Sequence, residues 1–207
     1  MARSSIIAIG ASAGGVSALC LLASELPETI GVPILVVLHI GAQPSALPKL
    51  LSTAGALRAK HAEDGEEALP GRIYVAAPDH HMIVAGGRLH LSRGFKENCA
   101  RPAIDPLFRS VAESYGPAAV GVILTGNLND GTLGLFEISR RGGITIGQDS
   151  TDAAYPDMPR SAAVHVTLDY RPRLSDIPKL LVELAIGKDG KEKRCHRLMW
   201  KPPMNQK

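Results

Sequence analysis

Residues 8–19 read AIGASAGGVSAL, in which an apolar run gives way to a glycine-rich turn and then to a helix-like pattern. A buried strand followed by such a turn and a helix is typical of an α/β fold. Three interpretations of the turn are open: a phosphate cradle, a turn that exposes a nucleophile, or a tight turn alone. Ser12 occupies the place where a dinucleotide fingerprint has its middle glycine.

Strand and helix patterns alternate along the rest of the chain. Short apolar, β-branched runs predict strands at 4–10, 33–39, 72–77, 118–126 and 143–148, and helical spacing predicts helices at 14–25, 45–54, 104–115, 130–141 and 175–186. Near-continuous apolarity is typical of strands covered on both faces, as in parallel sheets. Residues 80–93 break the alternation as a β-hairpin. The sequence therefore predicts an α/β fold, a doubly wound, mostly parallel, Rossmann-like sheet with an inserted β-hairpin.

Length and charge limit the organisation of the chain. Its 207 residues suffice for one domain, predicted at 1–186, followed by a basic, flexible tail at 187–207 that carries seven Lys or Arg against two acids. The other residues show no basic stripe with interleaved aromatics, so no nucleic-acid partner is expected. No apolar run reaches the roughly 18 residues of a membrane span, and no signal peptide precedes the first strand. We therefore expect a cytoplasmic protein without membrane insertion.

Three reactive side chains follow predicted strands. Ser12 follows the first strand, His39 ends the second, and Asp130 lies between the strand at 118–126 and the next helix. Because the carboxyl ends of parallel strands meet at one sheet edge, we expect these side chains to converge there. Serine as nucleophile, histidine as base and aspartate as the group that orients the histidine would then form a hydrolytic triad. The helix after Ser12 would bring backbone N–H groups to a developing oxyanion.

Each of the three residues also has a simpler interpretation. Ser12 and Asp130 could cap the helices that follow them, and His39 could be a hydrogen-bonded core histidine. The segment GASAG fits the Gly-x-Ser-x-Gly pattern of a nucleophile turn, which is weak by itself. The chain order Ser, His, Asp differs from the α/β-hydrolase order Ser, Asp, His, which argues against the common esterase fold. The phosphate cradle is the weakest interpretation, because the spacing of a dinucleotide fingerprint and a P-loop lysine are both missing.

The sequence resembles the catalytic domain of the chemotaxis protein-glutamate methylesterases over about residues 4–186. The matching segments, in the family's order, are IGASAGG, VVLHIG, AEDGEEALPGRIYVAAPDHHM, RPAIDPLFRSVAE, GVILTGNLNDGTLGL and DMPRSAA. The resemblance implies a Ser12–His39–Asp130 triad, with the backbone N–H groups of Ala13 and Asn127 as oxyanion donors. It implies no cofactor and no metal. The expected partner is a methylated chemoreceptor signalling domain, from which the enzyme releases methanol and whose glutamines it can also deamidate.

Several residues around the three groups depart from the family pattern. Ala13 replaces a threonine, Asn127-Leu128 replaces Met-Gly, and Ile40 replaces a methionine. These changes alter the pocket and leave the reacting groups in place, so the substrate stays open. Two alternatives to receptor demethylation therefore remain, namely hydrolysis of another acyl or methyl-ester substrate and a non-catalytic scaffold with a relict triad.

The remaining expectations concern the histidine pair, one arginine and the chain start. Adjacent histidines on a strand point to opposite faces, so His80 and His81 are expected to serve the hairpin or the surface rather than a metal. Arg160 could recognise acidic receptor groups or form a structural pair. The family commonly carries an N-terminal receiver domain, whereas this sequence starts at the first predicted strand, so a stand-alone domain and a piece of a longer protein both stay open.

Overall fold

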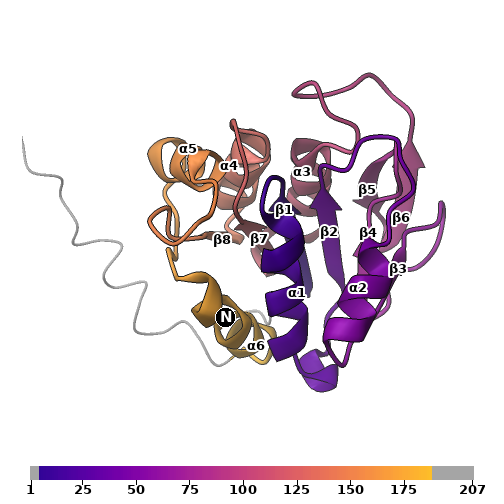
Figure 1. Cartoon of the computed structure of the whole chain (residues 1–207), viewed down its shortest axis with the longest axis horizontal. Helices are drawn as coiled ribbons and strands as arrows, with labels where there is room; N and C mark the ends of the chain where they lie inside the picture. Colours follow the sequence, from indigo (N-terminus) through magenta and orange to yellow (C-terminus); the bar gives the residue numbers. More distant parts are fainter. Residues whose placement is uncertain (1–4, 188–207) are drawn as a thin grey trace, which may run out of the picture.

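The computed structural model describes residues 5–187, which form a parallel sheet with helices on both faces (Figure 1). The six strands of the sheet lie in the order β3-β4-β2-β1-β7-β8, and every neighbouring pair is parallel. A separate antiparallel hairpin is formed by β5 and β6. The strands are β1 (Ile6–Ala11), β2 (Ile34–Leu38), β3 (Arg58–His61), β4 (Arg72–Val75), β5 (His81–Ala85), β6 (Arg88–Ser92), β7 (Ala119–Ile123) and β8 (Ile144–Gly147). The helices are α1 (Gly15–Glu25), α2 (Leu47–Ala54), α3 (Ile104–Tyr115), α4 (Thr132–Arg140), α5 (Asp157–His165) and α6 (Ile177–Ala185).

The two faces of the sheet carry two hydrophobic clusters. Along β1, Ile7 and Ile9 pack with α1, α2 and α6, whereas Ile6 and Ala8 pack with α3, α4, α5 and the hairpin. This alternation follows from the two-residue period of a strand, and burial on both faces explains why the strand sequences are continuously apolar. Apolar burial of this kind is the main stabilising contribution to such a fold.

The predicted doubly wound sheet with an inserted hairpin is confirmed, and two elements were missed. The edge strand β3 reads RAKH and has no buried residue, so it carries no hydrophobic pattern. Helix α5 starts at Asp157 in a segment rich in polar residues and proline, to which the sequence patterns assigned no element. The strand predicted at 118–126 is shorter, because β7 ends at Ile123 and the following residues form the loop to α4.

The order of the strands places a switch point beside β1. Strand β2 lies on one side of β1, and β7, which comes later in the chain, lies on the other side of β1. In open α/β sheets the loops that follow strands at such a point form the usual binding crevice. Residues 12–14 follow β1 and residues 124–131 follow β7, so both loops reach this crevice.

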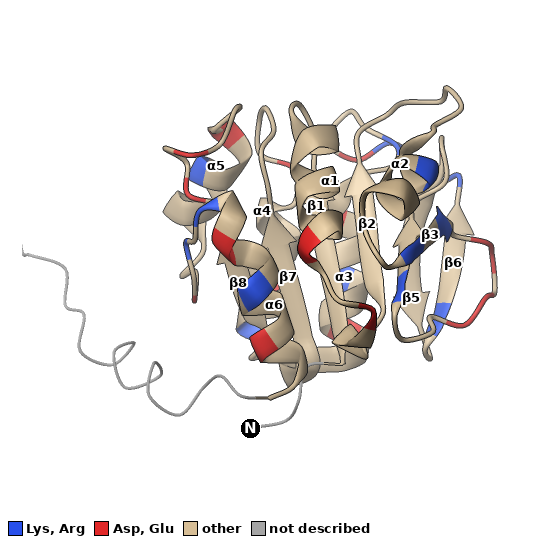
Figure 2. Cartoon of the chain, turned by 60° about the horizontal axis from the view of Figure 1, so that its bottom comes forward, with Lys and Arg blue, Asp and Glu red and all other residues tan. Residues whose placement is uncertain are grey.

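Charged residues of both signs are interspersed over the described part of the chain. Figure 2 shows blue and red segments side by side on α6 and near α5, without a continuous basic stripe in that view. Within residues 5–187, no helix combines the length and the apolar character needed to cross a membrane. The predicted tail at 187–207 lies, apart from Gly187, outside the described residues.

Candidate active site

The strand register brings Ser12 next to His39. Ala11 is paired with Leu38 across the β1–β2 ladder, so the residues that follow each strand are neighbours. The ladder continues for one more bond, in which the backbone N–H of His39 donates to the carbonyl of Ala11 over 3.3 Å. The position of both side chains at this sheet edge is therefore a direct result of parallel pairing.

A chain of hydrogen bonds joins the three predicted residues. The distance from Ser12 Oγ to His39 Nδ1 is 3.1 Å, and that from His39 Nε2 to Asp130 Oδ2 is 2.7 Å. A carboxylate only accepts, so the Nε2–H group of His39 donates to it and Nδ1 is left as the acceptor for the serine hydroxyl. Many Ser-His-Asp sites use the two ring nitrogens the other way round. Either nitrogen can act as the base when the other holds the proton.

Asp130 is 3 % exposed and accepts five hydrogen bonds. Its Oδ2 accepts from His39 and from the N–H of Ile104 at 2.7 Å each, and the donors to Oδ1 are the side chain of Asn98 and the N–H groups of Asp105 and Gly131. Burial by itself raises the pKa of this carboxyl, but the bonds from His39, Ile104 and Asn98 outweigh it and leave the pKa below the ordinary value. Asp130 is therefore ionised wherever the fold is intact near neutral pH.

The simpler interpretations of the three residues are wrong. The N-cap of α1 is Gly14, with φ of 74°, and that of α4 is Gly131, with φ of 89°, so neither Ser12 nor Asp130 caps its own helix. Instead the carboxylate of Asp130 accepts from the first N–H groups of α3, where a helix favours a negative charge. The side chain of His39 is 21 % exposed and is no core histidine.

The two predicted oxyanion donors belong to loops that are bonded to each other. The N–H of Ser12 donates to the carbonyl of Thr125 over 3.0 Å, and the Thr125 hydroxyl donates to the carbonyl of Ala13 over 3.0 Å. Among the hydrogen bonds of residues 5–187, none uses the backbone N–H of Ala13 or Asn127. Both groups are therefore available to an incoming oxygen.

A glycine is required where the two loops meet. A Cβ atom on Gly126 would lie 2.1 Å from Met158 Sδ and 2.8 Å from Ser12 Cβ. The N–H of Gly126 also donates to Tyr155, and its carbonyl accepts from Met158, so α5 holds the loop from the other side. Helix α5, which the sequence patterns missed, therefore supports the segment beside the serine.

Two further polar residues, Asn98 and Asp105, lie near Asp130. Asn98 has φ of 49°, and its amide donates to both Asp130 Oδ1 and Asp105 Oδ2. Asp105 is 2 % exposed; burial and the nearby Asp130 raise its pKa, although bonds from Gly134 and Asn98 oppose the shift. An acid at the start of the predicted helix 104–115 was the sequence signal for Asp105, whereas nothing in the local sequence marked Asn98.

The other singled-out residues lie outside this hydrogen-bond chain. His81 begins β5 and is 4 % exposed, so it serves the hairpin from the interior; its Nε2 donates to the carbonyl of Phe95 and its Nδ1 accepts from Ala103. His80 bonds to the carbonyl of Pro78. Arg160 is exposed on α5 and forms no ion pair with any residue that the structure describes. Over the same residues, 5–187, no group of three His, Cys, Asp or Glu is placed to hold a metal ion.

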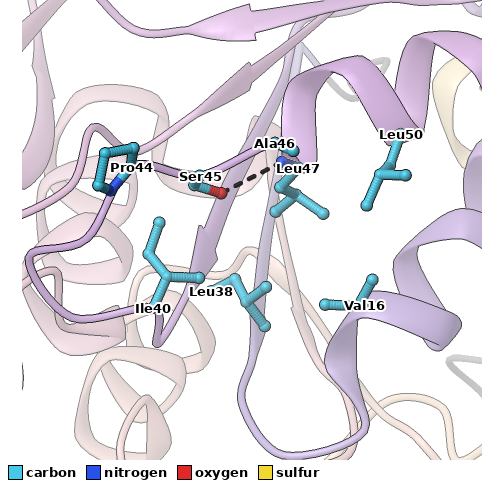
Figure 3. A pocket seen from close by; sticks show the side chains of 8 residues that line it. All are labelled: Val16, Leu38, Ile40, Pro44, Ser45, Ala46, Leu47 and Leu50. Atoms are coloured by element: carbon cyan, nitrogen blue, oxygen red, sulfur yellow. Dashed lines mark hydrogen bonds between the residues drawn. The ribbon is translucent and has the colours of Figure 1, made fainter.

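An open apolar groove of about 320 Å³ lies between α1 and α2, and its lining includes Leu38 and Ile40, the chain neighbours of His39 (Figure 3). Val16 on α1 and Leu50 on α2 face each other across it and are 44 % and 45 % exposed. The only hydrogen-bonding side chain in the lining is that of Ser45, which already accepts from the N–H of Leu47. The lining residues are Val16, Leu38, Ile40, Pro44, Ser45, Ala46, Leu47 and Leu50, none of them charged.

Replacing Leu128 with glycine is expected to stabilise the protein. Leu128 has φ of 65° and is 73 % exposed. Its left-handed backbone conformation therefore costs free energy that burial of the side chain does little to offset. Glycine adopts this backbone without strain, and the free energy of unfolding should rise by about 0.5–1 kcal/mol. Urea denaturation measures the change. Leu133→Gly is the matched control, because Leu133 is 67 % exposed in the first turn of α4, where glycine should destabilise.

Comparison with known proteins places this geometry in a family. Residues 7–181 match the family described as CheB methylesterase. The crystal structure of the Thermotoga maritima CheB methylesterase catalytic domain superposes with a TM-score of 0.83 at 35 % identity, covering 88 % of this chain and 100 % of that one. The fold and the matched segment define the class as a methylesterase domain. The chain belongs to the CheB methylesterase family.

Two relatives show how much of a longer protein the chain spans. It is 46 % identical over 159 residues to protein-glutamate methylesterase/protein-glutamine glutaminase 4 of Myxococcus xanthus, which covers 76 % of this chain and 45 % of the relative. A Leptospira interrogans protein with the same two activities in its provisional name is 38 % identical over 180 residues, covering 86 % of this chain and 93 % of that protein. The chain thus spans about half of the first relative and nearly all of the second.

Proposed function

We propose that the chain is a serine hydrolase that removes methyl esters from glutamate side chains of chemoreceptor signalling domains, releasing methanol in the cytoplasm. The observation that carries this proposal is the unbroken hydrogen-bond chain from Ser12 through His39 to Asp130 at the switch point of the sheet. The names of the relatives add protein-glutamine deamidation as a second reaction of the same site.

The mechanism follows from the roles that the three groups can take. Nδ1 of His39 removes the proton of Ser12 as Oγ attacks the ester carbonyl, and Asp130 stabilises the imidazolium that forms. The N–H groups of Ala13 and Asn127 donate to the tetrahedral oxyanion. Collapse of the intermediate breaks the bond to the methoxy oxygen, which leaves as methanol with the proton from His39. Water then attacks the acyl-enzyme with the same base and releases glutamate.

Glutamine deamidation uses the same sequence of steps. The amide presents the same carbonyl to Ser12, and ammonia leaves in place of methanol after taking the proton from His39. The amide is the poorer leaving group, so this reaction depends more strongly on the proton that the imidazolium delivers.

Methanol release from a methylated chemoreceptor signalling domain tests the proposal. The purified protein is expected to release methanol from this substrate and to lose that activity with Ser12→Ala. Release from another methylated protein but not from the receptor would favour the alternative acyl substrate. No release from any ester, together with no labelling of Ser12 by a fluorophosphonate, would favour the scaffold with a relict triad.

The apolar groove between α1 and α2 supports a protein substrate, and Leu50→Ser tests its contribution. An uncharged groove whose lining includes the two chain neighbours of His39 suits an apolar side chain of the protein that carries the ester. Loss of one partly buried leucine contact should raise KM for the protein substrate roughly fivefold to tenfold and leave hydrolysis of a small ester unchanged. Leu69→Ser is the matched control, since Leu69 is 39 % exposed and lies outside the groove lining. An equal KM for the two variants would contradict this role.

A further inference from the structure

The amide of Asn98 connects two buried carboxylates. Its Nδ2 lies 2.6 Å from Asp130 Oδ1 and 2.8 Å from Asp105 Oδ2. Asp105 and Asp130 are 2 % and 3 % exposed, and each carboxylate also accepts backbone N–H groups from a neighbouring helix. Two acids so close together repel unless donors lie between them, and one NH₂ group supplies a proton to each.

The backbone at Asn98 is built as a tight turn. Asn98 and Cys99 both have positive φ, at 49° and 59°, and Glu97 and Ala100 are joined by two backbone hydrogen bonds of 3.2 and 2.8 Å. This is the pattern of a two-residue hairpin turn in which asparagine is favoured at the first central position. The turn fixes the direction of the Asn98 amide, because the backbone hydrogen bonds between Glu97 and Ala100 hold the residues on either side of it.

The same loop is tied to the segment that follows His39. Arg101 donates to Asp79 Oδ1 through Nε at 2.9 Å and Nη2 at 2.7 Å. The N–H of Asp79 in turn donates to the carbonyl of Gly41, two residues after His39. The loop of Asn98 is therefore connected to the segment of His39 in two ways. One connection runs through Arg101 and Asp79, and the other runs from Asn98 through Asp130 to His39.

We propose that Asn98, together with Asp105, is a positioning unit that holds the Asp130 carboxylate in the orientation at which it bonds to His39. The amide of Asn98 bonds to Asp130 and Asp105 rather than to Ser12 or His39, so it acts through Asp130. Without the amide, Oδ1 of Asp130 loses its shortest donor, and the carboxylate can rotate away from the imidazole. This inference rests on the proposed function, since it assigns a role within the same site.

Asn98→Gly tests the unit without breaking the turn, because glycine accepts a positive φ. The variant should lower kcat for a small ester roughly tenfold to hundredfold and leave KM within about twofold. The proton on His39 Nε2 should move upfield or broaden in the ¹H NMR spectrum. Cys99→Gly alters the same turn and keeps the amide, so it should leave both readouts as in the wild type. Asp105→Asn places a second NH₂ group opposite that of Asn98. It should change kcat and the His39 resonance in the same direction as Asn98→Gly.

The outcomes separate this inference from the proposed function. An unchanged kcat and an unchanged His39 resonance in folded Asn98→Gly would overturn the positioning role. Equal losses in Cys99→Gly and Asn98→Gly would also overturn it, because the turn rather than the amide would then be responsible. A wild type that neither hydrolyses esters nor labels at Ser12 would contradict the proposed function, while the His39 resonance would still decide on the positioning role.

Discussion

Replacing Ser12 with alanine is expected to lower methyl-ester hydrolysis roughly 10⁴- to 10⁶-fold, the scale on which a serine hydrolase loses turnover without its nucleophile. The hydroxyl is the only group of the hydrogen-bond chain that can form the acyl intermediate, and its proton is directed at Nδ1 of His39 over 3.1 Å. The fold should remain intact, because Ser12 is not the N-cap of α1 and its backbone N–H keeps its bond to Thr125. Methanol release and fluorophosphonate labelling, mapped by mass spectrometry, measure the effect.

Ser17→Ala is the matched control for this prediction. Ser17 lies on the exposed side of α1, five residues from Ser12, and its loss should leave the rate unchanged. His39→Ala should abolish labelling of Ser12 as well, because the hydroxyl reacts only when a base takes its proton. Equal labelling of wild type and Ser12→Ala would place the nucleophile elsewhere.

Asp130→Asn is expected to reduce turnover roughly 10³- to 10⁴-fold. The asparagine NH₂ group would donate to Nε2 of His39 and force the ring proton onto Nδ1, where it faces the serine hydroxyl and prevents proton removal. The carbonyl oxygen of the amide can serve only part of the five donors that now point at the carboxylate. Steady-state kinetics on a small ester measure the loss, and Asp176→Asn at the exposed N-cap of α6 is the control.

Asp130→Asn should also change how the free energy of unfolding depends on pH. Hydrogen bonds lower the pKa of Asp130 in the fold, so its ionised form stabilises the protein above the ordinary carboxyl pKa near 3.8. That contribution is lost as the pH falls through the lowered pKa. Asp130→Asn should therefore be less stable than wild type at neutral pH, and the difference should shrink below about pH 4. A constant difference across this range, measured by urea denaturation at several pH values, would contradict the assigned cause.

Apolar periodicity was enough to predict the doubly wound sheet. Strands buried on both faces must be apolar throughout, so β1, β2, β4, β7 and β8 were visible in the sequence. The edge strand β3 was not, because its hydrogen bonds come from the β4 backbone while none of its side chains is fully buried. Helix α5 was missed for a related reason, since only Met158, Pro159 and Ala162 are buried in it.

The sequence by itself also predicted that Ser12, His39 and Asp130 converge at one edge of the sheet. Residues that follow parallel strands of one sheet lie at the same edge, and the structure adds the register Ala11–Leu38, which makes Ser12 and His39 neighbours. Only the tertiary structure decided which donors surround Asp130. The amide of Asn98 and the first N–H groups of α3 reach it from segments 25 to 32 residues away in the chain, and hydrogen bonds of that kind depend on side-chain direction rather than on any local pattern.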